Sequence, residues 1–254
     1  MKIYISTDLE GATGVFKFRQ TREKETPEFK DAIRLLMGDI AAVADGLRAA
    51  GADEIYAMDG HNGGNNFIPD CMAAGVQYIT GWPRGGGFAG LDRQCSGVIL
   101  LGYHAMKGTP DGVLNHTQSS TNETKYIYDN IERGEIYQSA VVAGAFNVPV
   151  MLVTGDEATC REARATLGDD LTTVAVKKGL GRESAILLAP EDARRLLREG
   201  ARQAVAALAL RKPYNIKLPI HCKISSIDPR DPTNATPRVI EREIEISDPL
   251  KITG

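Results

Sequence analysis

The chain has 254 residues, of which 43% are hydrophobic and 25% are charged, and this balance is ordinary for a globular protein with a substantial core. The formal net charge of −3 gives no electrostatic reason to expect a nucleic acid or an anionic membrane as a partner. No stretch approaches the roughly 20 apolar residues that a membrane span needs, and Asp8 interrupts the first apolar run too early for a signal peptide. We therefore expect a cytoplasmic protein that binds neither nucleic acid nor membranes.

The cysteines are widely scattered and form no CxxC pair, so the sequence indicates neither a zinc knuckle nor a thioredoxin-type motif. Without a secretion signal, free buried thiols are expected rather than disulfides. The cysteines concerned are Cys71, Cys95, Cys160 and Cys222.

The first sixty residues predict a strand, a helix and a second strand. Residues 2–7 are strand-like, and apolar residues then recur at spacings of three and four from Phe29 to Leu47, as on one face of an amphipathic helix. Gly51 stands where such a helix would end. The strand-like run at 54–59 follows, and this order is typical of two parallel strands joined by a crossover helix.

The same alternation continues along the chain. Strands are predicted at 76–80, 97–104, 148–157 and near 171–176, and a hairpin is predicted to turn near Asp129 and Asn130. Helices are predicted at about 134–146, at about 157–167 and from 190 to about 210. The pattern predicts an α/β fold with a mainly parallel central sheet and flanking helices.

The last forty residues differ in composition, because they are rich in Pro and Asp and indicate strands joined by loops. We therefore expect an α/β domain over residues 1–212 and a small β-rich C-terminal segment over residues 213–254, packed on the same domain.

Acidic and histidine side chains follow several of the predicted strands directly. Asp8 and Glu10 come after the first strand in "STDLEG", His61 follows the second, and His104 ends the apolar central strand. His116 lies in a loop shortly afterwards. Because ligands of open parallel sheets bind outside the carboxyl ends of the strands, these side chains are expected to converge there. Carboxylate and imidazole together suit zinc or another first-row divalent ion, whereas magnesium and calcium prefer oxygen ligands.

Each of these residues also has an ordinary structural interpretation. An Asp-x-Glu after a strand is commonly a solvated turn, the Asp-Gly before His61 is itself a turn signal, and His104 could be a hydrogen-bonded core histidine. Their joint arrival at one sheet edge is what favours a metal site. The remaining histidine, His221, alternates within a strand pattern, has no acidic neighbour in sequence and is predicted to be structural.

The motifs "DLEG", "DGH", "LGYHA", "GVLNH" and "GE" before a small-residue helix resemble, in this order and spacing, the DppA-type D-aminopeptidases. The resemblance runs from residue 1 to about 210 and includes "AFNVPVMLVTGDE". It implies a dinuclear metallo-aminopeptidase that hydrolyses short peptides from the free N-terminus, with a preference for D-amino acids. It also implies two zinc ions (Zn2+) per chain, with Mn2+ or another first-row divalent ion as the alternative.

Carried over position by position, the resemblance implies these metal ligands: Asp8, Glu10, His61, His104 and Glu135. Asp8 would bridge the two ions, with Glu10 and His61 on one ion and His104 and Glu135 on the other. His116 matches the catalytic histidine of the family and would give a proton to the leaving amine.

Spacing alone does not single out Glu135 from the acidic residues that precede it, which are Glu123, Asp129 and Glu132. The resemblance fades beyond about residue 213. It also implies a ring-shaped homo-oligomer, with a decamer as one expected size.

Two other functions remain open at this point. A metal-dependent phosphohydrolase also places an acidic turn after the first strand of an α/β sheet, although here the second acid is Glu and histidines supply the remaining candidate ligands. A non-catalytic module could use the same metals structurally.

Overall fold

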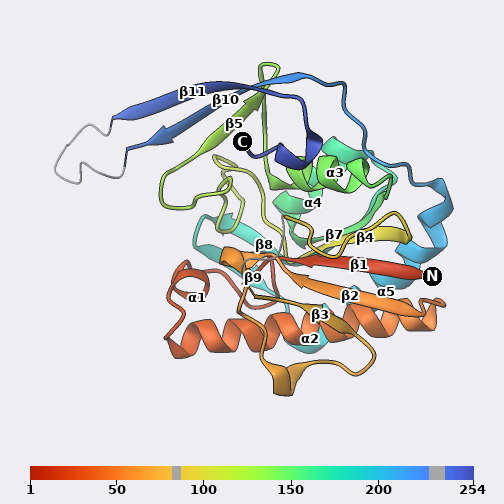
Figure 1. The fold of residues 1–254 in the computed structure, drawn as a ribbon. Helices are drawn as coiled ribbons and strands as arrows, with labels where there is room; N and C mark the ends of the chain where they lie inside the picture. Colours follow the sequence, from red (N-terminus) through yellow and green to blue (C-terminus); the bar gives the residue numbers. More distant parts are fainter. Residues whose placement is uncertain (82–86, 229–237) are drawn as a thin grey trace.

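The protein is described here by a computed structural model, which covers residues 1–81, 87–228 and 238–254. Its centre is a seven-stranded sheet (Figure 1). In spatial order the strands are β3 (Gln77–Ile79), β2 (Glu54–Asp59), β1 (Lys2–Thr7), β4 (Cys95–Leu101), β7 (Val150–Asp156), β8 (Thr172–Gly181) and β9 (Ser184–Leu187). All neighbouring pairs are parallel except β8 and β9. The α/β class and the mainly parallel sheet predicted from the sequence are confirmed.

Helices cover both faces of this sheet (Figure 1). Helices α2 (Pro27–Ala49) and α5 (Pro190–Ala207) pack on one face, and α3 (Glu135–Ala145) and α4 (Glu157–Leu167) lie over the other. Alternation along β1 separates the two cores, because Ile3 and Ile5 join the α2–α5 cluster whereas Tyr4 joins the α3–α4 cluster. A strand that is apolar on both faces is therefore buried from both sides.

Helix α2 forms where the apolar spacing predicts it. Thr26 caps its N-terminus by accepting a hydrogen bond from the backbone N–H of Phe29, and Pro27 occupies the first turn, where no N–H is needed. Gly51 follows the helix with a φ of 93°, a conformation that favours glycine.

Several boundaries differ from the sequence prediction. Strand β4 ends at Leu101, so His104 lies in the loop beyond it. Strand β8 runs on to Gly181 because it pairs with β9, which the sequence pattern missed together with the short helix α1 (Arg19–Arg22). The short 3-10 turns are η1 (His61–Gly63), η2 (Pro69–Cys71), η3 (Leu208–Leu210) and η4 (Pro249–Lys251).

A second, antiparallel sheet contains the C-terminal segment. Its order is β11 (Val239–Ile246), β10 (Ile220–Ile227), β5 (Lys125–Tyr128) and β6 (Ile131–Arg133). The predicted β5–β6 hairpin turns at Asp129 and Asn130, whose φ values of 44° and 69° are typical of a tight hairpin turn. Strand β10 pairs with β5, and the β10–β11 hairpin extends away from the body (Figure 1). The tail is β-rich as predicted, residues 229–237 of it lie outside the described part, and the domain boundary at residue 212 stays a prediction.

The four cysteines are free, with Cys95, Cys160 and Cys222 buried and Cys71 half-buried. Among the described residues, no helix combines the length and the apolar character that crossing a bilayer requires.

Candidate metal centre

The loop that follows β1 lies against the end of β4. The backbone N–H of Gly11 donates to the carbonyl of Gly102 over 2.7 Å. A Cβ atom on Gly11 would lie only 1.8 Å from the carbonyl oxygen of Tyr103, so no larger residue fits there without moving the backbone. This close approach explains why glycine follows the acidic pair, and it places Asp8 and Glu10 beside the loop after β4.

His61 begins the turn after β2 and faces both acidic residues. Its Nδ1 lies 3.0 Å from Oδ1 of Asp8 and 3.2 Å from Oε2 of Glu10. Its Nε2 is 2.8 Å from the carbonyl oxygen of Thr21, which can accept the Nε2 proton. A histidine whose second nitrogen donates to a carbonyl is oriented to bind a cation through the first one.

His104 occupies the corresponding position on the other side of Asp8. Its Nε2 lies 3.4 Å from Oδ2 of Asp8 and 3.4 Å from Oε1 of Glu135, the first residue of α3. Its Nδ1 is 3.0 Å from the carbonyl oxygen of Ala105. The two oxygens of Asp8 therefore face two different histidines.

His116 completes the cluster from the loop after β4. Its ring stacks on that of His104, with centroids 4.0 Å apart and planes 14° from parallel. Its Nδ1 is 2.8 Å from the carbonyl oxygen of Leu114, and its Nε2 is 3.8 Å from Oε1 of Glu135. The structure thus brings together all six residues that the sequence and the resemblance select, and their individual roles stay predictions.

His221 lies elsewhere, half-exposed on β10. The sequence shows no acidic residue beside it, but pairing with β11 places Oε2 of Glu243 3.4 Å from its Nε2.

The donor atoms of the cluster fit a bound cation. Those of Asp8, Glu10 and His104 lie within 4.8 Å of one another, as do those of His104, His116 and Glu135. Nε2 of His104 and Oε2 of Glu10 are buried and form no hydrogen bond with the described residues. Buried polar atoms rarely lack a hydrogen-bond partner in folded proteins. A mixed set of carboxylates and imidazoles is typical of zinc sites.

The charges of the cluster perturb one another strongly. Burial raises the pKa of Asp8 to about 7, and the neighbouring Glu10 carboxylate acts in the same direction. Burial opposes the charged form of His104, but the carboxylates of Glu135 and Asp8 outweigh it and raise the pKa of His104 to about 10. Burial and the adjacent His104 lower the pKa of His116 to about 4, so His116 is neutral at pH 7.

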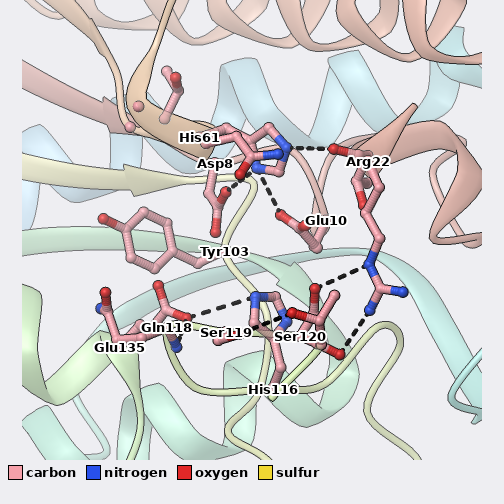
Figure 2. A pocket seen from close by; sticks show the side chains of 16 residues that line it. Asp8, Glu10, Arg22, His61, Tyr103, His116, Gln118, Ser119, Ser120 and Glu135 are labelled. Atoms are coloured by element: carbon pink, nitrogen blue, oxygen red, sulfur yellow. Dashed lines mark hydrogen bonds and ion pairs between the residues drawn. The ribbon is translucent and has the colours of Figure 1, made fainter. Parts of the chain in front are cut away.

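The cluster opens into a cavity of about 530 Å³, a volume typical of small-molecule sites (Figure 2). Sequence reasoning missed several of the side chains that line it: Thr21, Arg22, Tyr103, Gln118, Ser119, Ser120 and Thr121. Tyr103 lies within the quoted motif "LGYHA", but no motif marks the others, because they come from α1 and from the loop at 118–121, which only the folded chain brings together. The hydroxyl group of Tyr103 lies at hydrogen-bonding distance from two serine hydroxyls, those of Ser6 (2.9 Å) and Ser139 (3.0 Å).

Lys177 was also missed. It is buried on β8, and its Nζ donates to the backbone carbonyls of Glu10 (2.6 Å), Ala12 (2.9 Å) and Val15. These bonds fix the loop that carries the acidic pair. A lysine in a strand-like stretch gives no sequence signal for such a contact.

Comparisons with known proteins agree with this geometry. A family model described as D-aminopeptidase matches residues 1–240. The D-aminopeptidase of Bacillus subtilis (strain 168) is 33% identical over 206 residues, which cover 78% of this chain and 72% of that protein. A solved structure, the Zn-dependent D-aminopeptidase DppA from Bacillus subtilis, described as a self-compartmentalizing protease, matches with a TM-score of 0.87 and 25% identity over 99% of this chain and 94% of that one. These findings confirm the resemblance noted in the sequence. The chain belongs to the D-aminopeptidase family.

Proposed function

We propose that the cluster binds two zinc ions and that the protein hydrolyses the first peptide bond of short peptides, with a preference for a D-residue at the free N-terminus. The observation that carries the proposal is the position of Asp8, whose Oδ1 faces His61 and whose Oδ2 faces His104. A carboxylate placed in this way can bridge two cations. Membership of the D-aminopeptidase family and the zinc dependence of the solved relative support the activity and the metal.

In this proposal, Glu10 and His61 complete the ligands of one ion, and His104 and Glu135 complete those of the other. Bound zinc would supply Lewis-acid activation of water and of the scissile carbonyl. The carbonyls of Thr21 and Ala105 hold the two ligand histidines in the orientation that ligation requires.

His116 is proposed as the residue that moves a proton. Because its Nδ1 can donate to the carbonyl of Leu114, Nε2 keeps its lone pair toward the cavity. A neutral imidazole in this position can take a proton at Nε2 from the attacking water and pass it to the leaving amine. The ring remains oriented throughout by its stacking on His104.

Metal content per chain, measured on protein incubated with zinc and then freed of excess, tests the site. We expect about two equivalents for the wild type and neither ion for Asp8→Ala, since a bridge serves both. One full equivalent retained by Asp8→Ala would contradict bridging, and none bound by the wild type would contradict the site.

Peptide hydrolysis tests the role of His116. His116→Ala should keep both zinc ions and lose turnover on D-alanyl dipeptides, whereas His221→Ala, far from the cluster, should keep both properties. Unchanged turnover in His116→Ala would remove its proposed role, and loss of one zinc ion would make His116 a ligand instead. Faster hydrolysis of p-nitrophenyl phosphate than of dipeptides would favour the alternative phosphohydrolase, and an inert metal-loaded protein would favour the structural module.

We also propose that the chain assembles into a homo-oligomer, because the solved relative is described as self-compartmentalizing. A ring, with a decamer as one expected size, is the form that the resemblance implies. Size-exclusion chromatography with light scattering measures the mass, and a monomer would contradict the proposal. The cytoplasmic location expected from the sequence stays a prediction.

A further inference from the structure

Arg22 is the one lysine or arginine among the described residues that line the cavity. It lies across the cavity from Tyr103 and Glu135 (Figure 2). No carboxylate of the described residues forms an ion pair with it, whereas Arg19 on the same helix pairs with Glu28. Its charge is therefore free to act on a ligand.

Two residues, Phe18 and Ser120, hold the Arg22 guanidinium in place. It stacks over the ring of Phe18, 3.7 Å from the centroid. Its Nε donates to Oγ of Ser120 over 3.0 Å, and its Nη2 donates to the carbonyl oxygen of Ser120 over 2.8 Å. These bonds occupy the Nε–Nη2 edge of the guanidinium and leave the Nη1–Nη2 edge for a second partner. Guanidinium edges match carboxylates, which they bind through two parallel hydrogen bonds.

The neighbourhood of Arg22 strengthens this preference for an anion. The guanidinium of Arg182 also packs against the Phe18 ring, 5.0 Å from its centroid, and forms an ion pair with the carboxylate of Glu123 over 2.9 Å. Partial burial and Arg182 lower the pKa of Arg22, against an opposing effect of Glu10 and Glu183, so a further positive charge beside Arg22 is disfavoured. A ligand group that meets Arg22 is therefore expected to be negative.

We propose that Arg22 binds the C-terminal carboxylate of a short peptide whose N-terminal residue lies at the Asp8–His61–His104 cluster. The protein would then recognise both ends of its substrate. This makes a peptide acid a better substrate than the same peptide with an amidated C-terminus. The inference rests on the proposed function, since it needs the peptide bond to be cut at the metal cluster.

The test compares D-alanyl-D-alanine with D-alanyl-D-alaninamide by the initial rate of release of the N-terminal residue. The wild type should prefer the acid. Arg22→Gln removes the charge and the free edge, and should lower kcat/KM for the acid about 10- to 100-fold, which is the loss expected for hydrogen bonds to a charged group. The amide should lose much less, and the effect on the acid should be mainly in KM.

Arg19→Gln is the matched control, because Arg19 lies on the same short helix but pairs with Glu28 over 3.2 Å and does not line the cavity. It should leave the acid-to-amide ratio unchanged. Arg22→Lys keeps the charge without the planar edge and should give an intermediate ratio; this variant decides the question if Arg22→Gln does not fold.

The outcomes separate this inference from the proposed function. A wild type that cuts both peptides equally well, or Arg22 variants that keep the wild-type ratio, would overturn the inference and leave the aminopeptidase activity standing. A wild type that cuts neither peptide would overturn both.

Discussion

Lys177→Met removes the ammonium that holds the loop after β1. In the folded protein this group donates to the carbonyls of Glu10, Ala12 and Val15, all of which are buried residues. Methionine is similar in length and apolar, so it fills the space but donates no hydrogen bond. The substitution therefore tests whether a side chain on β8 keeps the acidic pair in position.

The size of the effect follows from two opposing terms. A buried carbonyl that loses its donor costs about 1–3 kcal/mol, so three of them cost about 6 kcal/mol in the middle of that range. Burial lowers the pKa of Lys177 from 10.5 to about 8, and a difference of that size corresponds to about 3 kcal/mol that methionine recovers. The expected net loss of unfolding free energy is about 3 kcal/mol.

Urea unfolding of the zinc-free protein at pH 7 measures this loss. Competition with a chelator measures zinc affinity, which should fall because Glu10 lies on the loop after β1 that Lys177 no longer holds. Lys178→Met is the control: Lys178 is exposed, with Glu157 3.8 Å away, and its loss should cost about 0.5 kcal/mol or less. If Lys177→Met matched Lys178→Met in stability and zinc affinity, the loop would not depend on Lys177.

Three further predictions concern the same region. Gly11→Ala should lower the free energy of unfolding by several kcal/mol and abolish zinc binding, because the added Cβ would lie 1.8 Å from a backbone oxygen. Gly181→Ala is the control, since open space surrounds Gly181, and it should bind zinc normally. The zinc content of both variants checks this prediction. Burial raises the pKa of Asp39 to about 6, so the folded protein keeps this proton where the unfolded chain loses it, and stability should fall by up to about 3 kcal/mol as the pH rises from about 4 to about 6. Asp39→Asn should lack this fall, and urea unfolding over the same pH range measures it. If the unfolding free energies of the wild type and of Asp39→Asn changed with pH in parallel, the reasoning would be contradicted. Chelation should lower the thermal unfolding midpoint and added zinc should restore it, because a ligand that binds only the folded state stabilises it; an unchanged midpoint would show that the cluster holds no ion.

The sequence by itself determines the framework of the site. Apolar periodicity marks α2 and the buried strands, and the α/β alternation implies parallel strands. Parallel strands end at the same sheet edge, so the sequence pattern alone predicts that Asp8, His61 and His104 meet there. That expectation needs only local pattern and topology, and in the structure Nδ1 of His61 lies 3.0 Å and Nε2 of His104 lies 3.4 Å from the two oxygens of Asp8.

Only the tertiary structure decides the contacts between segments that are far apart in the chain. Glu135 could not be told from its acidic neighbours by spacing, and only the packing of α3 places its Oε1 3.4 Å from His104. Arg22 and Lys177 carry no local signal either, because their partners in the loops at 120 and 10–15 are 98 and more than 160 residues away. Secondary-structure patterns reflect which face of an element is buried, whereas these contacts depend on which loops the fold brings together, and that is set by the packing of the whole chain.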